Sequence, residues 1–195
     1  DEARRATRLV QFDHDAADLE AARQAARKVS RTARSVSATT GAAAGLGGAL
    51  SMSADIPATI AIALRAIRDT GRAYGYTGDG PAEKLFRLQI LELAAVDEPE
   101  ARRDRIAALE AALGPAGELV HADHEHIAPI VDQAVERISR AIAFTSFRSR
   151  AGMVVPLVGS IVGGLVNSSF QEDVGKAARF AFQARRLKGD ASAAA

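Results

Sequence analysis

The stretch HDAADLEAARQAARKVSRTARSVS, residues 14–37, decides the fold class of this chain. Its apolar residues recur at intervals of three and four, which is the spacing of side chains on one face of an α-helix. Those residues are Leu19, Ala22, Ala26 and Val29. Asp15 is a suitable N-cap, because its carboxylate can accept a hydrogen bond from a free amide of the first turn. The stretch therefore predicts a long amphipathic helix.

Helical periodicity extends over most of the remaining chain, and proline and glycine mark its interruptions. The expected helices cover residues 57–76, 81–96, 98–114, 126–150 and 172–187. Pro57 and Pro81 suit the first turn of a helix, and Gly114 suits the end of one. The chain is rich in alanine and only 5% aromatic, which also favours helix. We predict an all-α fold, a single compact domain of about seven or eight helices.

The composition excludes several classes of protein. The net charge is only +1, whereas a dedicated nucleic-acid-binding protein is normally basic. The absence of cysteine excludes disulfides, zinc–thiolate sites and cysteine nucleophiles, and it is compatible with the cytosol. The first residue is Asp rather than Met, so the true N-terminus and any signal peptide stay open.

Two stretches rich in small residues carry no charge, 35–54 over 20 residues and 151–171 over 21. Their length fits a membrane span, but their glycine, serine and alanine content argues against one. Each contains a G-x-x-x-G pair, a spacing that lets another backbone approach closely. The pairs are Gly41 with Gly45 and Gly159 with Gly163, and Leu46 is a large apolar side chain beside the first. We expect two central Gly/Ala-rich helices that pack together or wall a narrow apolar cleft.

An acid and a proline, Asp55 and Pro57, separate the first of these stretches from the apolar run that follows it. The pattern predicts that Asp55 caps the helix whose first turn holds Pro57, since both hydrogen bonding and the helix dipole favour an acid there. The functional alternative is a buried acid kept for chemistry or for a polar ligand.

Several short motifs resemble those of the EcsC family. They are DIP (55–57), ALRAI (63–67), YGY (74–76), VPLVGSIVGGLVN (155–167) and AARFAFQARRL (177–187). The resemblance covers residues 35–187, which leaves an N-terminal amphipathic basic helix at 1–34 and a disordered tail at 188–195. The family is bacterial and is named for a gene beside an ABC-transporter pair, so the resemblance implies helical architecture and proximity to membrane processes. It supplies no catalytic residues.

The same resemblance singles out five polar positions, for which caps and buried ion pairs are the expected roles. They are Asp55, Arg65, Tyr74, Asn167 and Arg186.

Basic residues are concentrated before the first uncharged stretch, and no acid occurs from residue 21 to residue 54. Four arginines there share one helix face, Arg23, Arg27, Arg31 and Arg34. A surface with an apolar centre and a basic rim suits an anionic bilayer, so we interpret these arginines as headgroup ligands. The alternative is an ordinary solvated helix face.

Three of the four histidines lie in HADHEH, residues 121–126. His121, His124 and Glu125 have a helical spacing that could bind a metal, although their order matches neither H-E-x-x-H nor H-x-x-E-H. An exposed polar helix start explains the cluster equally well. Neither a nucleophile elbow nor a P-loop occurs, so we expect no cofactor.

These observations favour a non-enzymatic protein that binds lipid or another apolar ligand between its glycine-rich helices. We expect it at the cytoplasmic face of the inner membrane, with a link to ABC-transporter or cell-envelope processes and without nucleic acid. One alternative is an interaction adaptor whose groove takes a membrane-protein helix or a second copy of the chain. Another is a metal-dependent hydrolase built on the HADHEH cluster.

Overall fold

The computed structural model describes residues 14–15, 17–46, 52–96, 98–120 and 156–194. Within these residues the protein has five α-helices and no β-strand, which confirms the predicted all-α class. The helices are α2 (Leu19–Leu46), α3 (Met52–Ala73), α4 (Pro81–Ala95), α5 (Pro99–Ala111) and α7 (Pro156–Ala193). The expected total of seven or eight included a helix at 126–150, which lies outside the described residues.

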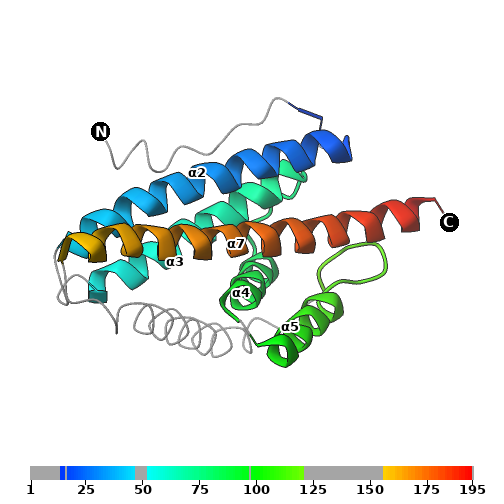
Figure 1. Ribbon diagram of the computed structural model, residues 1–195. Helices are drawn as coiled ribbons and strands as arrows, with labels where there is room; N and C mark the ends of the chain where they lie inside the picture. The colour runs from blue at the N-terminus through cyan, green and yellow to red at the C-terminus, as the bar shows by residue number, and fades with distance from the viewer. Residues whose placement is uncertain (1–13, 16, 47–51, 97, 121–155, 195) are drawn as a thin grey trace.

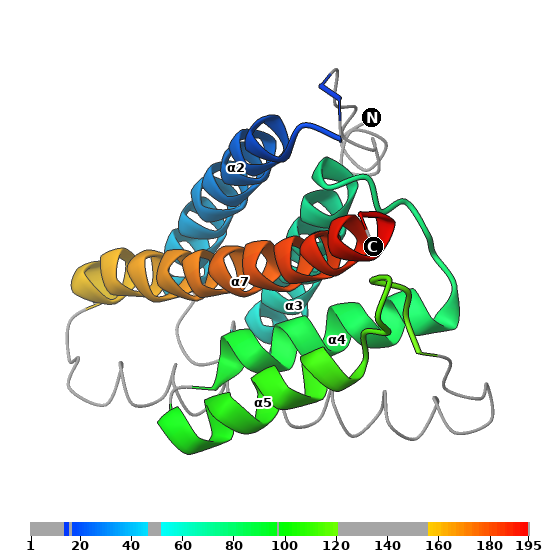
Figure 2. The same ribbon diagram turned by 90° about the vertical axis from the view of Figure 1, so that its right-hand side faces the viewer.

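Three long helices form the upper part of the molecule, and a helical hairpin lies below them (Figure 1). α2 and α7 run antiparallel to each other and pack together, while α3 contacts both. α4 packs beneath α7 and α3, and it pairs with α5 as an antiparallel hairpin (Figure 2). The contact between α2 and α7 therefore joins segments from the two halves of the sequence.

Asp18 caps α2, whereas the sequence predicted Asp15. The Asp18 carboxylate accepts hydrogen bonds from the amides of Glu20 and Ala21 at 2.9 and 3.1 Å. Asp15 instead accepts one from the amide of Ala17 at 2.8 Å, in a turn that precedes the helix. Both acids satisfy free amides, and the helix begins after the second one.

α2 and α7 are longer than the periodicity predicted. α2 continues through Gly41 to Leu46, so the predicted boundary at 34/35 falls inside a helix. α7 likewise joins the glycine-rich stretch to the C-terminal helix without a break. Tertiary packing along a helix outweighs the modest cost of single glycines within it.

α7 also includes most of the predicted disordered tail, since it remains helical as far as Ala193. The Lys188 ammonium donates to the carbonyl of Leu113 at 3.1 Å, and Arg186 forms an ion pair with Asp190 at 2.9 Å. These contacts hold the last turns of the helix, which composition alone did not indicate.

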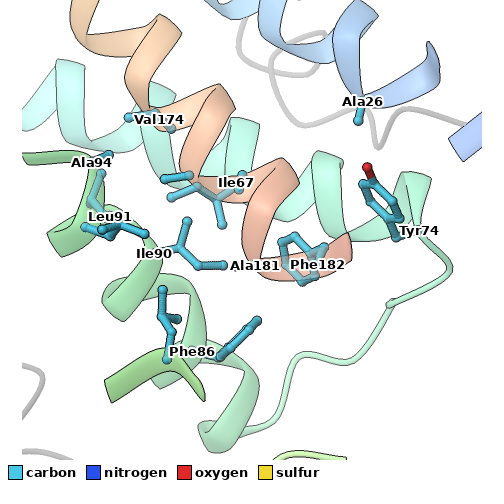
Figure 3. Close-up of a cluster of buried hydrophobic side chains, with 14 of the residues drawn as sticks. Ala26, Ile67, Tyr74, Phe86, Ile90, Leu91, Ala94, Val174, Ala181 and Phe182 are labelled. Atoms are coloured by element: carbon cyan, nitrogen blue, oxygen red, sulfur yellow. The ribbon is translucent and has the colours of Figure 1, made fainter. Parts of the chain in front are cut away.

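The apolar core lies where α3, α4 and α7 meet (Figure 3). Its fully buried side chains include Ile67, Ile90, Leu91, Val174 and Phe182. The Phe182 ring meets Phe86 edge-on at 5.7 Å and stacks on Tyr76 at 5.8 Å. α2 contributes small residues to the core, above all Ala22 and Ala26, as its apolar stripe predicted.

Arg185 fixes α7 to the lower hairpin. Its guanidinium lies 4.0 Å from the centre of the Tyr76 ring and forms an ion pair with Glu83 at 2.8 Å. It also donates to the carbonyl of Gly117 at 2.8 Å. Gly117 has φ +73°, and a Cβ there would collide with the carbonyl of Arg185, so only glycine suits this position. These contacts set where α7 lies relative to the rest of the molecule.

Candidate functional site

Facing stripes of α2 and α7 carry an unusual group of polar and charged residues, which we call the α2–α7 seam. The seam consists of Arg23, Arg27, Ser30 and Arg34 on α2 and of Glu172, Gly175, Arg179 and Gln183 on α7. Within each helix these residues are spaced by three, four or seven positions, so they share one face.

Contacts near the two ends of the seam define its antiparallel register. Arg23 Nε donates to Gln183 Oε1 at 3.3 Å, and Arg34 forms an ion pair with Glu172 at 3.1 Å. Counting four residues forward from Arg23 and four back from Gln183 leads to Arg27 and Arg179. The register therefore places two arginines opposite each other in the middle of the seam.

A serine and a glycine make the close approach at this midpoint possible. The Ser30 hydroxyl donates to the carbonyl of Ala26 at 3.2 Å and accepts a hydrogen bond from Arg179 Nη1 at 2.6 Å. A Cβ on Gly175 would collide with the Ser30 side chain and would lie 3.3 Å from Arg179 Nη1. A larger residue at 175 would therefore displace both polar groups.

The ends of the seam are close to electrically balanced. Glu20 lies 3.6 Å from Arg23, and Glu172 also pairs with Lys176 at 3.2 Å. The hydrogen bond from Lys176, followed by the charge of Arg34, lowers the pKa of Glu172. A carboxylate thus accompanies the arginine at each end.

At the centre of the seam, no carboxylate of the described residues accompanies the arginines. Burial lowers the pKa of Arg179, and the charge of Arg27 lowers it further, while Tyr74 and Glu172 oppose the shift. Arg27 is exposed and Arg179 is partly buried. Among the described residues, neither guanidinium forms an ion pair with an acid.

A buried hydroxyl lies close to these cations. Tyr74 is 1% exposed, and its hydroxyl has no hydrogen-bond partner among the described residues. The hydroxyl points toward α2 beside Ala26 (Figure 3). Burial raises the pKa of Tyr74, and the charges of Arg23, Arg179 and Arg27 oppose that shift. The phenol therefore remains a neutral donor within the field of three arginines.

The predicted headgroup arginines have unequal surroundings. Arg23 and Arg34 contact α7, whereas Arg31 is exposed and donates to the carbonyl of Arg27 in its own helix at 3.4 Å. Sequence reasoning missed Arg179 as their counterpart. The signal available in the sequence was the spacing of Glu172, Arg179 and Gln183 on one face of α7.

The predicted cleft residues occupy helical backbone at one end of the bundle. Gly41, Gly45 and Leu46 lie in the last turns of α2, and Gly159 and Gly163 lie in the first turns of α7. Both helix ends lie at the left of the molecule in Figure 1. The side chains of these residues lie outside the described part of the chain, so the apolar cleft stays a prediction.

The predicted structural polar residues have mixed outcomes. α3 begins at Met52, so Asp55 lies inside the first turn rather than at the N-cap. The dipole of the helix still favours an acid there. Arg65 forms an ion pair with the buried Asp69 at 3.7 Å. Asn167 lies within α7, and its side chain is outside the described part of the chain.

The predicted metal ligands His121, His124 and Glu125 lie outside the described residues, so that hypothesis stays a prediction. In the described ranges, no three histidines, aspartates or glutamates are grouped to hold a metal ion. Over the same ranges, no helix combines the length and the apolar character that crossing a membrane requires.

Comparison with known proteins shows the relationship of the chain. Over 147 residues it is 24% identical to the uncharacterized protein YdbA of Bacillus subtilis (strain 168), which covers 73% of this chain. The chain spans about half the length of that relative, 49%. No solved structure matches. The family model described as the EcsC protein family matches residues 5–187, across the predicted boundary at 34/35. The chain belongs to the EcsC protein family.

Proposed function

We propose that this protein is a non-enzymatic, membrane-peripheral helical protein of the cytoplasmic face of the inner membrane. In this proposal the outer face of α2 contacts anionic lipid, and a lipid or another apolar ligand binds between the two central glycine-rich helices. The proposal extends to a role beside an ABC transporter or in the cell envelope.

The observation that carries the proposal is the cationic outer face of α2. Lys28 and Arg31 are exposed on this face, and the chain has no acid from residue 21 to residue 54. Val36 follows on the same helix as an apolar side chain that is 47% exposed. Each basic residue near an anionic membrane surface contributes about 1 kcal/mol to binding. Basic residues followed by apolar surface are the combination that peripheral membrane helices use.

Vesicle co-sedimentation tests the membrane contact. We expect the wild-type chain to bind vesicles that contain phosphatidylglycerol and not to bind neutral phosphatidylcholine vesicles. The double variant Lys28→Glu with Arg31→Glu should bind anionic vesicles at least about tenfold more weakly. Both residues are exposed, so circular dichroism should show unchanged helicity.

A matched control places the same charge change elsewhere. Lys84 and Arg103 are exposed on the lower hairpin, away from α2. Their double reversal to glutamate should leave vesicle binding close to that of wild type. Equal loss in both double variants would mean that net charge alone governs binding, and this result would refute a role for the α2 face.

Native mass spectrometry tests the internal ligand. Protein purified gently from its producing cells should carry a mass excess that matches a lipid. A bare mass from several gentle preparations would refute a stably bound ligand.

A second candidate function is that of an interaction adaptor or homodimer, and the exposed face of α7 favours it. Phe180 and Leu187 are 44% and 48% exposed and lie seven residues apart on one helix face. Such a stripe suits a partner helix or a second copy of the chain. A dimer mass in light scattering, lost in Phe180→Asp with Leu187→Asp, would support this candidate. A monomer mass at all concentrations would refute the homodimer hypothesis.

A further inference from the structure

Two like charges face each other in the middle of the α2–α7 seam, and this is the least expected feature of the molecule. The neighbouring positions pair Arg23 with Gln183 and Arg34 with Glu172. At the midpoint, Arg179 is partly buried, and its hydrogen-bond partner among the described residues is a neutral hydroxyl, that of Ser30. Taking a guanidinium out of water is costly unless an anion compensates its charge.

Among the described residues, the acids nearest the seam are already paired, which favours an anion from solution as the partner. Glu20 pairs with Arg23 at one end, while Glu172 and Asp173 contact Lys176 at the other. Beneath the midpoint, the Tyr74 hydroxyl is buried without a partner among the described residues, and it points toward α2 (Figure 3). A buried donor that makes no hydrogen bond is unfavourable, and a bound oxyanion or its water would satisfy it.

We propose that Arg27 and Arg179 bind a phosphate group between α2 and α7, with the Tyr74 hydroxyl as a further donor beneath it. Guanidinium groups bind phosphate through paired hydrogen bonds. The oxygens of a phosphate point in tetrahedral directions, so the two arginines on opposite helices and the hydroxyl beneath them can each bond a different oxygen. Gly175 keeps the helices close enough for both arginines to reach one ligand.

The exposure of Arg27 indicates how the phosphate arrives. Because Arg27 is exposed on α2, the site suits a phosphate at the end of a molecule, either free phosphate or the headgroup of a phosphatidic-acid-like lipid. The two sources share the same chemistry. The site is compatible with the proposed membrane contact but does not depend on it, since inorganic phosphate needs no bilayer.

Isothermal titration calorimetry and thermal unfolding of the full chain test the site with inorganic phosphate, against chloride at equal ionic strength. We expect heat of binding and a higher Tm in phosphate for the wild type. Arg27→Gln should weaken phosphate binding at least about tenfold, as expected for the loss of a charge-assisted contact. Its Tm in chloride should equal or exceed that of wild type, because the substitution removes a repulsion.

Arg103→Gln is the matched control, since Arg103 is an exposed arginine with the same charge on α5, away from the α2–α7 seam. It should retain the full response to phosphate. Arg179→Gln should lose the response to phosphate. If that variant fails to fold, the response of Arg27→Gln tests the proposal by itself. An equal response in Arg27→Gln and Arg103→Gln, no response in the wild type, or a lower Tm of Arg27→Gln in chloride would each overturn the proposal.

Soluble dihexanoyl phosphatidic acid then identifies the source of the phosphate. Binding at least about tenfold tighter than inorganic phosphate, and lost in Arg27→Gln, assigns the site to a lipid headgroup. Equal affinity assigns it to free phosphate. Failure of the Lys28 and Arg31 reversals to affect vesicles would refute the membrane contact while leaving the phosphate result unchanged.

Discussion

Replacing Arg185 with alanine should weaken the attachment of α7 to the lower hairpin. The side chain contacts Glu83 at the start of α4, the ring of Tyr76 before α4, and the carbonyl of Gly117 after α5. Its own exposure is 9% and that of the Glu83 side chain is 14%, so the pair lies almost entirely out of water. The substitution would therefore leave a largely buried carboxylate and a carbonyl without their donor.

The expected cost is large because the charge left behind is buried. Breaking a buried ion pair by removing one partner costs about 3–5 kcal/mol. The lost donor to Gly117 and the lost contact with Tyr76 overlap with that term and should not be added in full. We expect a total of about 4 kcal/mol, which lowers Tm by about 8–16 °C in a domain of this size.

Urea and thermal unfolding followed by circular dichroism measure this loss. Arg186→Ala is the control at the next residue, because its ion pair with Asp190 is more exposed and should contribute less than about 1 kcal/mol. The double variant Arg185→Ala with Glu83→Ala should lose less stability than the two single variants together. A loss below about 1 kcal/mol in Arg185→Ala, or simple additivity with Glu83→Ala, would refute the coupling described here.

Three further substitutions test the core, a cap and a buried acid. Gly71→Ala should lower stability by about 1–3 kcal/mol in urea, because its Cβ would lie 2.7 Å from the Phe182 ring, whereas Gly80→Ala, in open space, should be nearly neutral. Asp18→Ala should cost about 1 kcal/mol and more than Asp15→Ala, measured in the same way; the reverse order would restore Asp15 as the cap. Burial raises the pKa of Asp69, so the contribution of Asp69 to the free energy of unfolding should fall as pH rises from about 3.8 through the raised pKa. Urea titrations at several pH values should show a smaller fall in Asp69→Asn.

Much of the fold could be predicted from the sequence, because its helices have clear edges. Pro81 and Pro99 stand at the first positions of α4 and α5, and α4 ends within one residue of the prediction. The apolar stripe of α2 likewise places Ala22 and Ala26 in the core. Proline and helical spacing act locally, so a reader of the sequence can use them without knowing the neighbours.

The joins between segments could not be predicted in the same way. Residues 35–46 and 156–171 contain glycines and lack charges, and composition suggested separate elements there. They are instead continuous with their neighbours in α2 and α7. Whether a helix continues through small residues depends on the tertiary structure around it, which local spacing does not indicate.

The candidate site shows the same limit of local reasoning more sharply. The stripe of Arg23, Arg27 and Arg34 was visible in the sequence and suggested a uniform basic surface. The structure instead places Gln183 and Glu172 opposite two of these arginines. Only this register of two distant helices shows that Arg27 lies opposite another cation. A solvated basic face does not require a second arginine at this position. It also does not require the hydrogen bond from Arg179 to Ser30 or the close contact of Ser30 with Gly175. The repulsion at this one position, rather than the number of arginines, is therefore what points to an anionic ligand.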